Sequence, residues 1–162
     1  MPEPALTVRP VGHVIGGPPE PKLDYWGGVH AVIRLDQTVF GPDATTGLAE
    51  YSHLEVIFLF HLAEELANAA TARHPRGNPA WPKVGVFAQR NMNRPNRLGL
   101  SRCALLAVDG LDLHVEGLDA VAGSPVVDIK PWVAGHGPRG PCREPAWSRE
   151  LMAHYFAPTA EH

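Results

Sequence analysis

Proline and glycine interrupt this chain so often that long regular elements are disfavoured. The sequence holds 17 prolines and 16 glycines among 162 residues. Proline cannot donate to a helix or strand ladder, and glycine favours turns, so short strands joined by turns are expected. Because these strands follow at near-regular spacing without βαβ alternation, the sequence predicts a mainly β fold, a small β-barrel or sandwich with short helical additions.

Size and composition favour one domain over residues 1–162, with a tail at residues 133–162 that is partly irregular and contains a short helix. A hydrophobic content of 44% with 19% charged residues is typical of a globular chain. The net charge of −3 does not suit a general nucleic-acid binder. Any contact with RNA would therefore have to be local.

The two cysteines bear on the cellular compartment. Cys103 and Cys142 lie far apart and form no CxxC pair, which argues against a zinc knuckle and against a disulfide-dense secreted scaffold. The longest apolar run, residues 56–62, is interrupted by His61 and is too short to cross a bilayer. An intracellular, cytoplasmic protein without a membrane partner is expected.

Alternating and apolar runs locate the expected elements. Strands are expected at residues 6–14, 29–35, 54–62, 84–89, 100–107, 111–115 and 126–129, with the run at 54–62 buried on both faces. Asp109-Gly110 predicts a hairpin turn. Residues 50–53 could form a helical turn, residues 64–73 a short helix or an extended loop, and residues 149–156 a helix capped by Ser148.

The most unusual segment is the loop after residue 89, because all of its charges are positive. Arg90, Arg94 and Arg97 fall within eight residues of each other. Pro95 restricts the backbone around Arg94, and Asn96 suits a turn, so the loop should have a defined shape. Guanidinium groups held this way can receive a carboxylate, a phosphate or a base edge. A solvated loop with scattered ion pairs is the alternative interpretation.

Other candidate site residues also have a structural alternative. The sequence Asp24-Tyr25-Trp26 places an acid beside two aromatic rings, which suits a cation or a nucleoside, although such rings often pack a loop onto the core. His61 follows the strand at 54–62, where side chains often line a site, or it packs in the core. Asp128 and Lys130 share one face of a strand, where they could form ion pairs or face a site.

Three stretches together resemble a known family. They are GLAEYSHLEVIFLFH at residues 47–61, VGVFAQRNMNRPNRLGLS at 84–101 and DAVAGSPVVDIKPW at 119–132. Their order and content are similar to the YaeB/TsaA-like family of S-adenosylmethionine-dependent tRNA methyltransferases. The resemblance implies a small β-barrel fold, usually dimeric. It also agrees with the lack of a GxGxxG or P-loop motif, which leaves a Rossmann-type nucleotide site unsupported.

The resemblance further implies S-adenosyl-L-methionine as cofactor and tRNA as partner, with methylation of N6-threonylcarbamoyladenosine next to the anticodon and no metal. The positions that match cofactor-binding places are Asp24, Tyr25, Trp26, His61, Leu62, Arg90, Leu100, Glu116, Gly117, Leu118 and Asp119. Arg94, Asn96, Arg97 and Lys130 are the candidates for RNA contact. If the reaction needs a general base, His61 and Asp128 are the candidates.

Departures from the family pattern keep other functions open. Arg97-Leu98 replaces the usual Pro-Ile, Ala122-Gly123-Ser124 stands where Asp-Gly-Thr is frequent, and Trp132 replaces tyrosine. A relative acting on another substrate is one alternative, and a non-catalytic barrel that binds RNA or a nucleotide is another. A metal-dependent barrel enzyme is the least favoured, because the nine histidines include no compact ligand pair.

Overall fold

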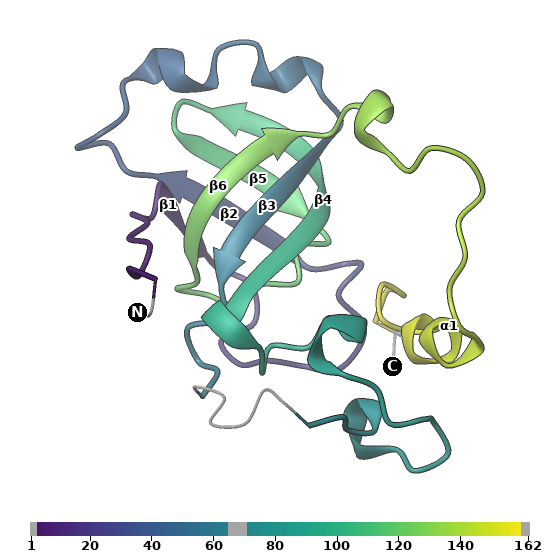
Figure 1. Cartoon of the computed structure of the whole chain (residues 1–162). Helices are drawn as coiled ribbons and strands as arrows, with labels where there is room; N and C mark the ends of the chain where they lie inside the picture. The colour runs from purple at the N-terminus through teal and green to yellow at the C-terminus, as the bar shows by residue number, and fades with distance from the viewer. Residues whose placement is uncertain (1–2, 65–70, 160–162) are drawn as a thin grey trace.

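Short antiparallel strands close into a barrel in the computed structural model, which describes residues 3–64 and 71–159 (Figure 1). Within these residues the strands are β1 (Gly12–Ile15), β2 (His30–Leu35), β3 (His53–Leu59), β4 (Leu98–Asp109), β5 (Asp112–Glu116) and β6 (Pro125–Pro131). Their order around the barrel is β1-β2-β5-β4-β3-β6. Since β1 also pairs with β6, no strand is left as an open edge. The predicted mainly β barrel is confirmed.

The helices are short, as the density of prolines predicts. The 3₁₀ turns are η1 (Pro42–Thr45), η2 (Leu48–Glu50), η3 (Pro75–Gly77), η4 (Val86–Ala88), η5 (Pro95–Arg97) and η6 (Ala134–His136), and α1 spans Ala146–Met152. Among residues 3–64 and 71–159, no helix has both the length and the apolar character that crossing a bilayer requires. The helices are additions to the barrel and do not form its core.

The barrel interior is filled by alternate residues of the strands. On β3, for example, Leu54, Val56 and Phe58 are at most 1% exposed, while the residues between them are partly exposed. The prediction that this strand is buried on both faces was therefore wrong. The reason is closure: a barrel wall has an inner face filled by side chains and an outer face in contact with solvent.

Alternation misled the sequence interpretation at residues 84–89. Val84 forms an isolated bridge with Arg73, and the chain then turns into η4 rather than a strand. Phe87, in that turn, is 82% exposed. The predicted strand was wrong because no neighbouring strand offers a ladder to this segment, and alternation without a partner does not make a strand.

Other element boundaries differ by a few residues. The first strand begins at Gly12 rather than at residue 6. Helix α1 begins at Ala146, directly after Pro145, so Ser148 lies inside the helix and is not its cap. The predicted helical turn at 50–53 lies earlier, at η2. The hairpin at Asp109-Gly110 is confirmed, with Gly110 at φ +58°. Residues 65–70 of the segment 64–73 lie outside the described residues.

The two cysteines lie in opposite environments, Cys103 inside the barrel and Cys142 in contact with solvent. Cys103 lies on β4, faces inward and is 2% exposed. Burial, reinforced by the nearby negative charge of Asp119, raises the pKa of the Cys103 thiol to about 12. Cys142, in contrast, is an exposed free cysteine. The two thiols should differ strongly in reactivity, because the thiolate is the reactive form.

We expect a thiol reagent to modify Cys142 alone in the native protein at about pH 8, near the ordinary thiol range, and to modify both cysteines after denaturation. The raised pKa of Cys103 also makes the free energy of unfolding depend on pH. The folded pKa exceeds the unfolded value of 9.0, so this contribution to stability is complete below pH 9.0 and declines as the pH rises towards about 12. Mass spectrometry of the labelled protein checks the first expectation. Rapid labelling of Cys103 in the native state would contradict it.

Candidate functional site at the loop end of the barrel

Strand direction decides where the candidate residues gather. Neighbours around the barrel are antiparallel, so β1, β3 and β5 run towards one end and β2, β4 and β6 run away from it. The connections at residues 16–29, 60–97 and 117–124 therefore meet at the same end, which we call the loop end. Figure 1 shows it as the lower end of the barrel, with α1 beside the teal segments. Most of the residues predicted for the cofactor site belong to these connections.

The segment Asp24-Tyr25-Trp26 is held in a defined shape. Asp24 accepts hydrogen bonds from the guanidinium of Arg76, at 2.9 and 3.1 Å. Trp26 is 3% exposed and donates its indole N–H to the carbonyl of Lys22, so its ring packs inward. Tyr25 is 40% exposed and has φ +66°. Of the three predicted cofactor contacts, Tyr25 is thus the one with an accessible ring.

Asp119 carries the clearest sign of a missing partner. Its Oδ2 accepts a hydrogen bond of 2.7 Å from the hydroxyl of Tyr155, and its backbone N–H lies 3.4 Å from Ser101 Oγ. Its Oδ1 is buried and has no donor among the described residues. An ionised carboxylate oxygen deprived of both water and a donor costs roughly 1–3 kcal/mol or more. A ligand that donates a hydrogen bond would remove this cost.

His61 has the same property on the neighbouring connection. Its Nδ1 is buried without a partner among the described residues. Its Nε2 lies 3.6 Å from the position that a Cβ on Gly123 would occupy, and Gly123 has φ +84°. The turn before β6 therefore packs closely on the imidazole. A neutral imidazole offers one donor and one acceptor nitrogen, so the unpartnered Nδ1 can serve either role for a ligand.

The arginine loop is folded onto backbone carbonyls. Arg90 donates to the carbonyl of Leu100 at 2.5 Å, Arg94 to that of Gln89 at 2.9 Å, and Arg97 to that of Ala63 at 3.0 Å. A carbonyl bears no formal charge, so the bonds of Arg90 and Arg94 orient their guanidinium groups without cancelling their charge. The expectation of a shaped loop is confirmed, because Pro95–Arg97 forms η5.

Backbone strain is concentrated at the loop end. Among the described residues, those with positive φ other than glycine are Tyr25, Arg76, Asn96 and Arg97. All four belong to connections at this end. Non-glycine residues in this region cost of order 1–3 kcal/mol each and persist where the surroundings fix them, commonly at functional sites. The strain and the unpartnered polar atoms thus mark the same part of the molecule.

The remaining predicted cofactor positions divide into exposed and buried groups. Leu62 and Leu100 are 53% and 44% exposed, and could cover the face of an apolar ligand group. Leu118 is fully buried in the core, so only its backbone could reach a ligand. Glu116 lies 3.8 Å from His30 in an exposed pair. Gly117, at φ +80°, turns the chain from β5 towards Asp119.

Asp128 and Lys130 lie on the outer wall instead of on the loop end. Lys130 Nζ contacts Asp128 Oδ2 at 2.8 Å, and both side chains are largely exposed. The hydrogen bond to Asp128, together with its negative charge, raises the pKa of Lys130. In the sheet register Ile57 separates Asp128 from Leu100. The structure thus pairs the two charged residues with each other and does not bring them together with His61 or Asp119.

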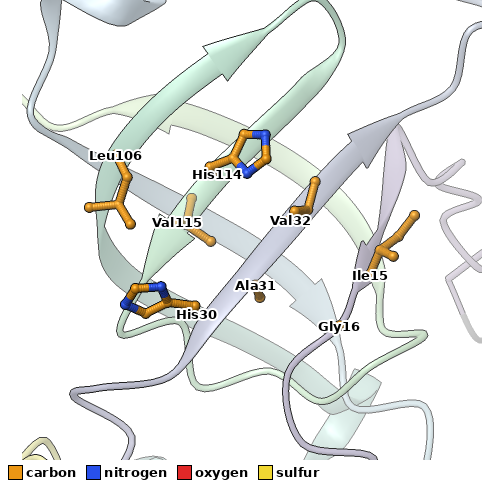
Figure 2. Close-up of a pocket in the computed structure, with 8 residues that line it drawn as sticks. All are labelled: Ile15, Gly16, His30, Ala31, Val32, Leu106, His114 and Val115. Carbon is orange, nitrogen blue, oxygen red and sulfur yellow. The ribbon is translucent and has the colours of Figure 1, made fainter.

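A separate hollow lies on the outer wall formed by β1, β2, β5 and β4 (Figure 2). His30, Val32 and His114 point outward there, with Leu106 and Ile15 at its sides. Leu106 sits at a β-bulge, because the pairing of β4 with β5 shifts between Leu105 and Ala107. No predicted cofactor residue lines this hollow, so it is distinct from the site at the loop end.

Sequence interpretation missed three residues that organise the loop end. Arg76 pairs with Asp24 from 52 positions away, Ser101 contacts Asp119 from 18 positions away, and Tyr155 does so from 36 positions away. No local pattern distinguishes these residues, because each acts through a long-range contact. The Gly/Pro-rich stretch before Tyr155 gave no signal that the chain returns to the site.

Comparisons with known proteins agree with this architecture. The family described as "tRNA-methyltransferase O N-terminal domain" matches residues 15–136. The "tRNA (adenine(37)-N6)-methyltransferase" of Homo sapiens is 32% identical over 162 residues, which cover 94% of this chain and 36% of that protein. The enzyme of the same name from Escherichia coli is 40% identical over 113 residues, which cover 66% of this chain and 45% of that protein.

A crystal structure of TrmO from Pseudomonas aeruginosa superposes with a TM-score of 0.70 at 26% identity, covering 88% of this chain and 62% of that one. The chain thus spans about a third of the length of its human relative and under two thirds of the solved structure. The family match includes β2 to β6 and the connections at the loop end. This chain belongs to the tRNA-methyltransferase O N-terminal domain family.

Proposed function

We propose that this protein is an S-adenosylmethionine-dependent methyltransferase that methylates the N6 position of N6-threonylcarbamoyladenosine next to the tRNA anticodon. Relatives carry the names "tRNA (adenine(37)-N6)-methyltransferase" and "Putative S-adenosylmethionine-dependent methyltransferase RcsF". The observation that carries the proposal is that two buried polar atoms at the loop end, Asp119 Oδ1 and His61 Nδ1, have no partner among the described residues. We place the activity in the cytoplasm, where tRNA is available.

The residues at the loop end fit S-adenosylmethionine in kind. Asp119 Oδ1 can accept a hydrogen bond from a ribose hydroxyl or an amino group. The exposed faces of Leu62 and Leu100 suit the apolar surface of an adenine ring. Arg90, whose guanidinium donates only to a neutral carbonyl, can pair with the carboxylate of the methionine part or with an RNA phosphate.

S-adenosylmethionine, when bound, supplies a methyl group for an in-line displacement, and the protein's part is to orient the reactants. His61 is the stronger of the two predicted bases. Its Nδ1 is unpartnered at the loop end, whereas Asp128 is already paired with Lys130 on the outer wall. In the tautomer that leaves Nδ1 as acceptor, His61 can take the proton released from the acceptor nitrogen.

We assign RNA contact to the arginine loop. Arg94 donates to a neutral carbonyl, which leaves its charge available, and Asn96 is exposed nearby. Arg97 belongs to the same loop and is a further candidate for RNA contact. Lys130 on the outer wall can add a further phosphate contact, because its side chain is 64% exposed. With a net charge of −3, the rest of the surface adds little attraction for RNA. Recognition therefore depends on this local patch.

The test is methyl transfer to tRNA. We expect the purified protein to transfer label from methyl-labelled S-adenosylmethionine to tRNA that carries N6-threonylcarbamoyladenosine, with the label recovered at that nucleoside after digestion. Matched tRNA without the threonylcarbamoyl group serves as the control and should stay unlabelled. Binding of the cofactor and tRNA without transfer would instead support a non-catalytic module, and absence of cofactor binding would refute the proposal.

The substitution Arg90→Ala should weaken binding of S-adenosylmethionine or of tRNA at least tenfold. The reason is the loss of a charge-assisted pair, worth about 1.5–3 kcal/mol. Isothermal titration calorimetry with each ligand measures the effect. Arg9→Ala removes an equal charge from the exposed segment before β1, at the other end of the barrel, and should change neither affinity. Unchanged binding of both ligands by Arg90→Ala would remove Arg90 from the site.

We also propose that the protein forms a homodimer through the wall that contains the hollow in Figure 2. Ile15 and Leu106 are 39% and 50% exposed on this wall, and partly buried Val32 lies between them. Apolar side chains grouped on one face mark an interaction site more often than scattered ones do. None of the predicted cofactor residues lines this hollow, although Gly16 at its edge belongs to the connection at residues 16–29.

Light scattering after gel filtration should give twice the monomer mass for the wild type and the monomer mass for Leu106→Asp, because a carboxylate at the centre of an apolar interface is costly to bury. Leu6→Asp is the matched control, since Leu6 is 94% exposed before β1 and should not affect assembly. A monomeric wild type, or a Leu106→Asp variant that remains dimeric, would contradict this interface.

A further inference from the structure

The C-terminal segment takes an indirect path back to the site. Strand β6 runs away from the loop end, so the chain leaves the barrel at the opposite end after Pro131. Residues 132–145 then bend away from the barrel and run alongside it, and α1 lies beside the loop end (Figure 1). Residues 137–159 lie beyond the part of the chain that matches the family. Their contacts are therefore features of this chain that the family match does not describe.

Two backbone hydrogen bonds connect this segment to the loop that contains Asp24, Tyr25 and Trp26, which we call the aromatic loop. The N–H of Tyr25 donates to the carbonyl of His154 at 3.0 Å, and the N–H of Trp26 donates to the carbonyl of Tyr155 at 2.8 Å. The Tyr25 ring also stacks on His154, with ring centroids 6.2 Å apart. These contacts hold Tyr25 at its positive φ. We call residues 146–157 the C-terminal clasp.

The approach of the clasp depends on a glycine. A Cβ on Gly27 would lie 2.0 Å from the carbonyl oxygen of Phe156, a distance that no side chain can occupy. The adjacent Gly28 has no atom within 4 Å of the same position. Neither glycine has a positive φ, so the difference between them is one of space and not of backbone freedom.

A second anchor fixes α1 to the arginine-rich side of the loop end. The indole N–H of Trp81 donates to Glu150 Oε2 at 2.7 Å, and the Trp81 and Trp147 rings lie 6.5 Å apart. Trp81 belongs to the connection at residues 60–97, so α1 is fixed to that connection, while Tyr25 and Trp26 bond to the residues just after α1. The clasp thus bridges two connections that are separate in the sequence.

One side chain of the clasp, Tyr155, contacts Asp119 at the loop end. The hydroxyl of Tyr155 donates to Asp119 Oδ2 at 2.7 Å. Burial and the negative charge of Asp119 raise the pKa of Tyr155, so the phenol remains protonated and keeps donating. The charges of Arg76 and Arg90 act on the same phenol in the opposite direction, which places it among the charged groups of the site.

The direction of this hydrogen bond decides what Asp119 can do. A phenol has a single proton, and Tyr155 gives it to Oδ2. The carboxylate is thereby fixed in one orientation, with Oδ1 buried and without a donor in residues 3–64 and 71–159. A carboxylate held in this way is prepared to accept one hydrogen bond from a ligand, without an entropic cost for choosing its orientation.

We propose that the C-terminal clasp completes the cofactor site, and that Tyr155 is a positioning residue that orients Asp119 so that Oδ1 accepts a hydrogen bond from the nucleoside part of S-adenosylmethionine. This inference rests on the proposed function, since it assumes that the loop end binds that cofactor. It adds residues that lie outside the family match to the site. It also holds that the close approach of Phe156 to Gly27 keeps the loop at residues 24–26 bonded to the clasp.

The first test is Tyr155→Phe, which removes one hydroxyl and keeps the ring. We expect calorimetry to show affinity for S-adenosylmethionine and for S-adenosylhomocysteine reduced about tenfold, since the affected contact is to the shared nucleoside and involves a charged acceptor. In the methyl-transfer assay the KM for the cofactor should rise while kcat at saturation stays close to the wild-type value. Tyr51→Phe, in an exposed residue at the other end of the barrel, should change neither quantity.

The second test releases the clasp without touching Tyr155 or Asp119. Gly27→Ala must displace the Phe156 carbonyl, whereas Gly28→Ala meets open space. We expect Gly27→Ala alone to weaken binding of the cofactor about tenfold or more and to speed amide hydrogen exchange at Tyr25 and Trp26, whose N–H groups bond to the clasp. The exchange measurement needs no ligand and reports on the clasp directly.

The outcomes separate the inference from the proposed function. A wild-type protein that does not bind S-adenosylmethionine overturns both. A wild type that binds, with Tyr155→Phe binding equally well, overturns the role of Tyr155 and leaves the proposed function standing. Tighter binding by either variant also overturns the inference, because the clasp would then obstruct the site. Loss of thermal stability in Tyr155→Phe with unchanged affinity would mean a merely structural role.

Discussion

The double pairing of β1 is the constraint on which the rest of the structure depends. This strand has four residues, and it bonds to β2 on one side and to β6 on the other. Gly12 stands where the two ladders meet, opposite Leu35 and Val126. A Cβ there would lie 2.3 Å from the carbonyl oxygen of Arg34, so the closure requires glycine. Once the sheet is closed, strand direction sends three connections to one end.

That geometry explains how a chain of net charge −3 can present a positive site. Arg90 and Arg94 donate to nearby backbone carbonyls, which fixes their positions and leaves their charge uncancelled. Two acidic residues of the same end already have partners, because Asp24 pairs with Arg76 and Asp119 Oδ2 accepts a hydrogen bond from Tyr155. Since Debye screening limits distant charges to about 10 Å at moderate salt, this local arrangement counts for more than the net charge.

The sequence allowed the barrel to be predicted and proposed residues for the site, and the failures in the element assignments and in the contacts have a common cause. Strands such as β2 and β5 follow from alternation, because each has a partner on both sides. The same alternation at residues 84–89 gave a wrong strand, since the pattern records a preference and not the presence of a neighbour. Asp24 stood out by its place beside two aromatic residues, and Asp119 was proposed through the family resemblance. Arg76 and Tyr155 did not, because their importance lies in contacts that only the folded chain creates.

The clasp suggests why strain and unsatisfied atoms coexist at the loop end. A tyrosine at φ +66° costs of order 1–3 kcal/mol, as does a buried carboxylate oxygen without a donor. Two backbone hydrogen bonds to the clasp hold Tyr25 in this conformation. The Tyr155 hydroxyl donates to only one of the two Asp119 carboxylate oxygens, Oδ2. The fold therefore offsets the backbone strain internally but leaves Asp119 Oδ1 to be satisfied from outside. A structural role alone would be served better by satisfying both oxygens, so the asymmetry itself favours a ligand at this position.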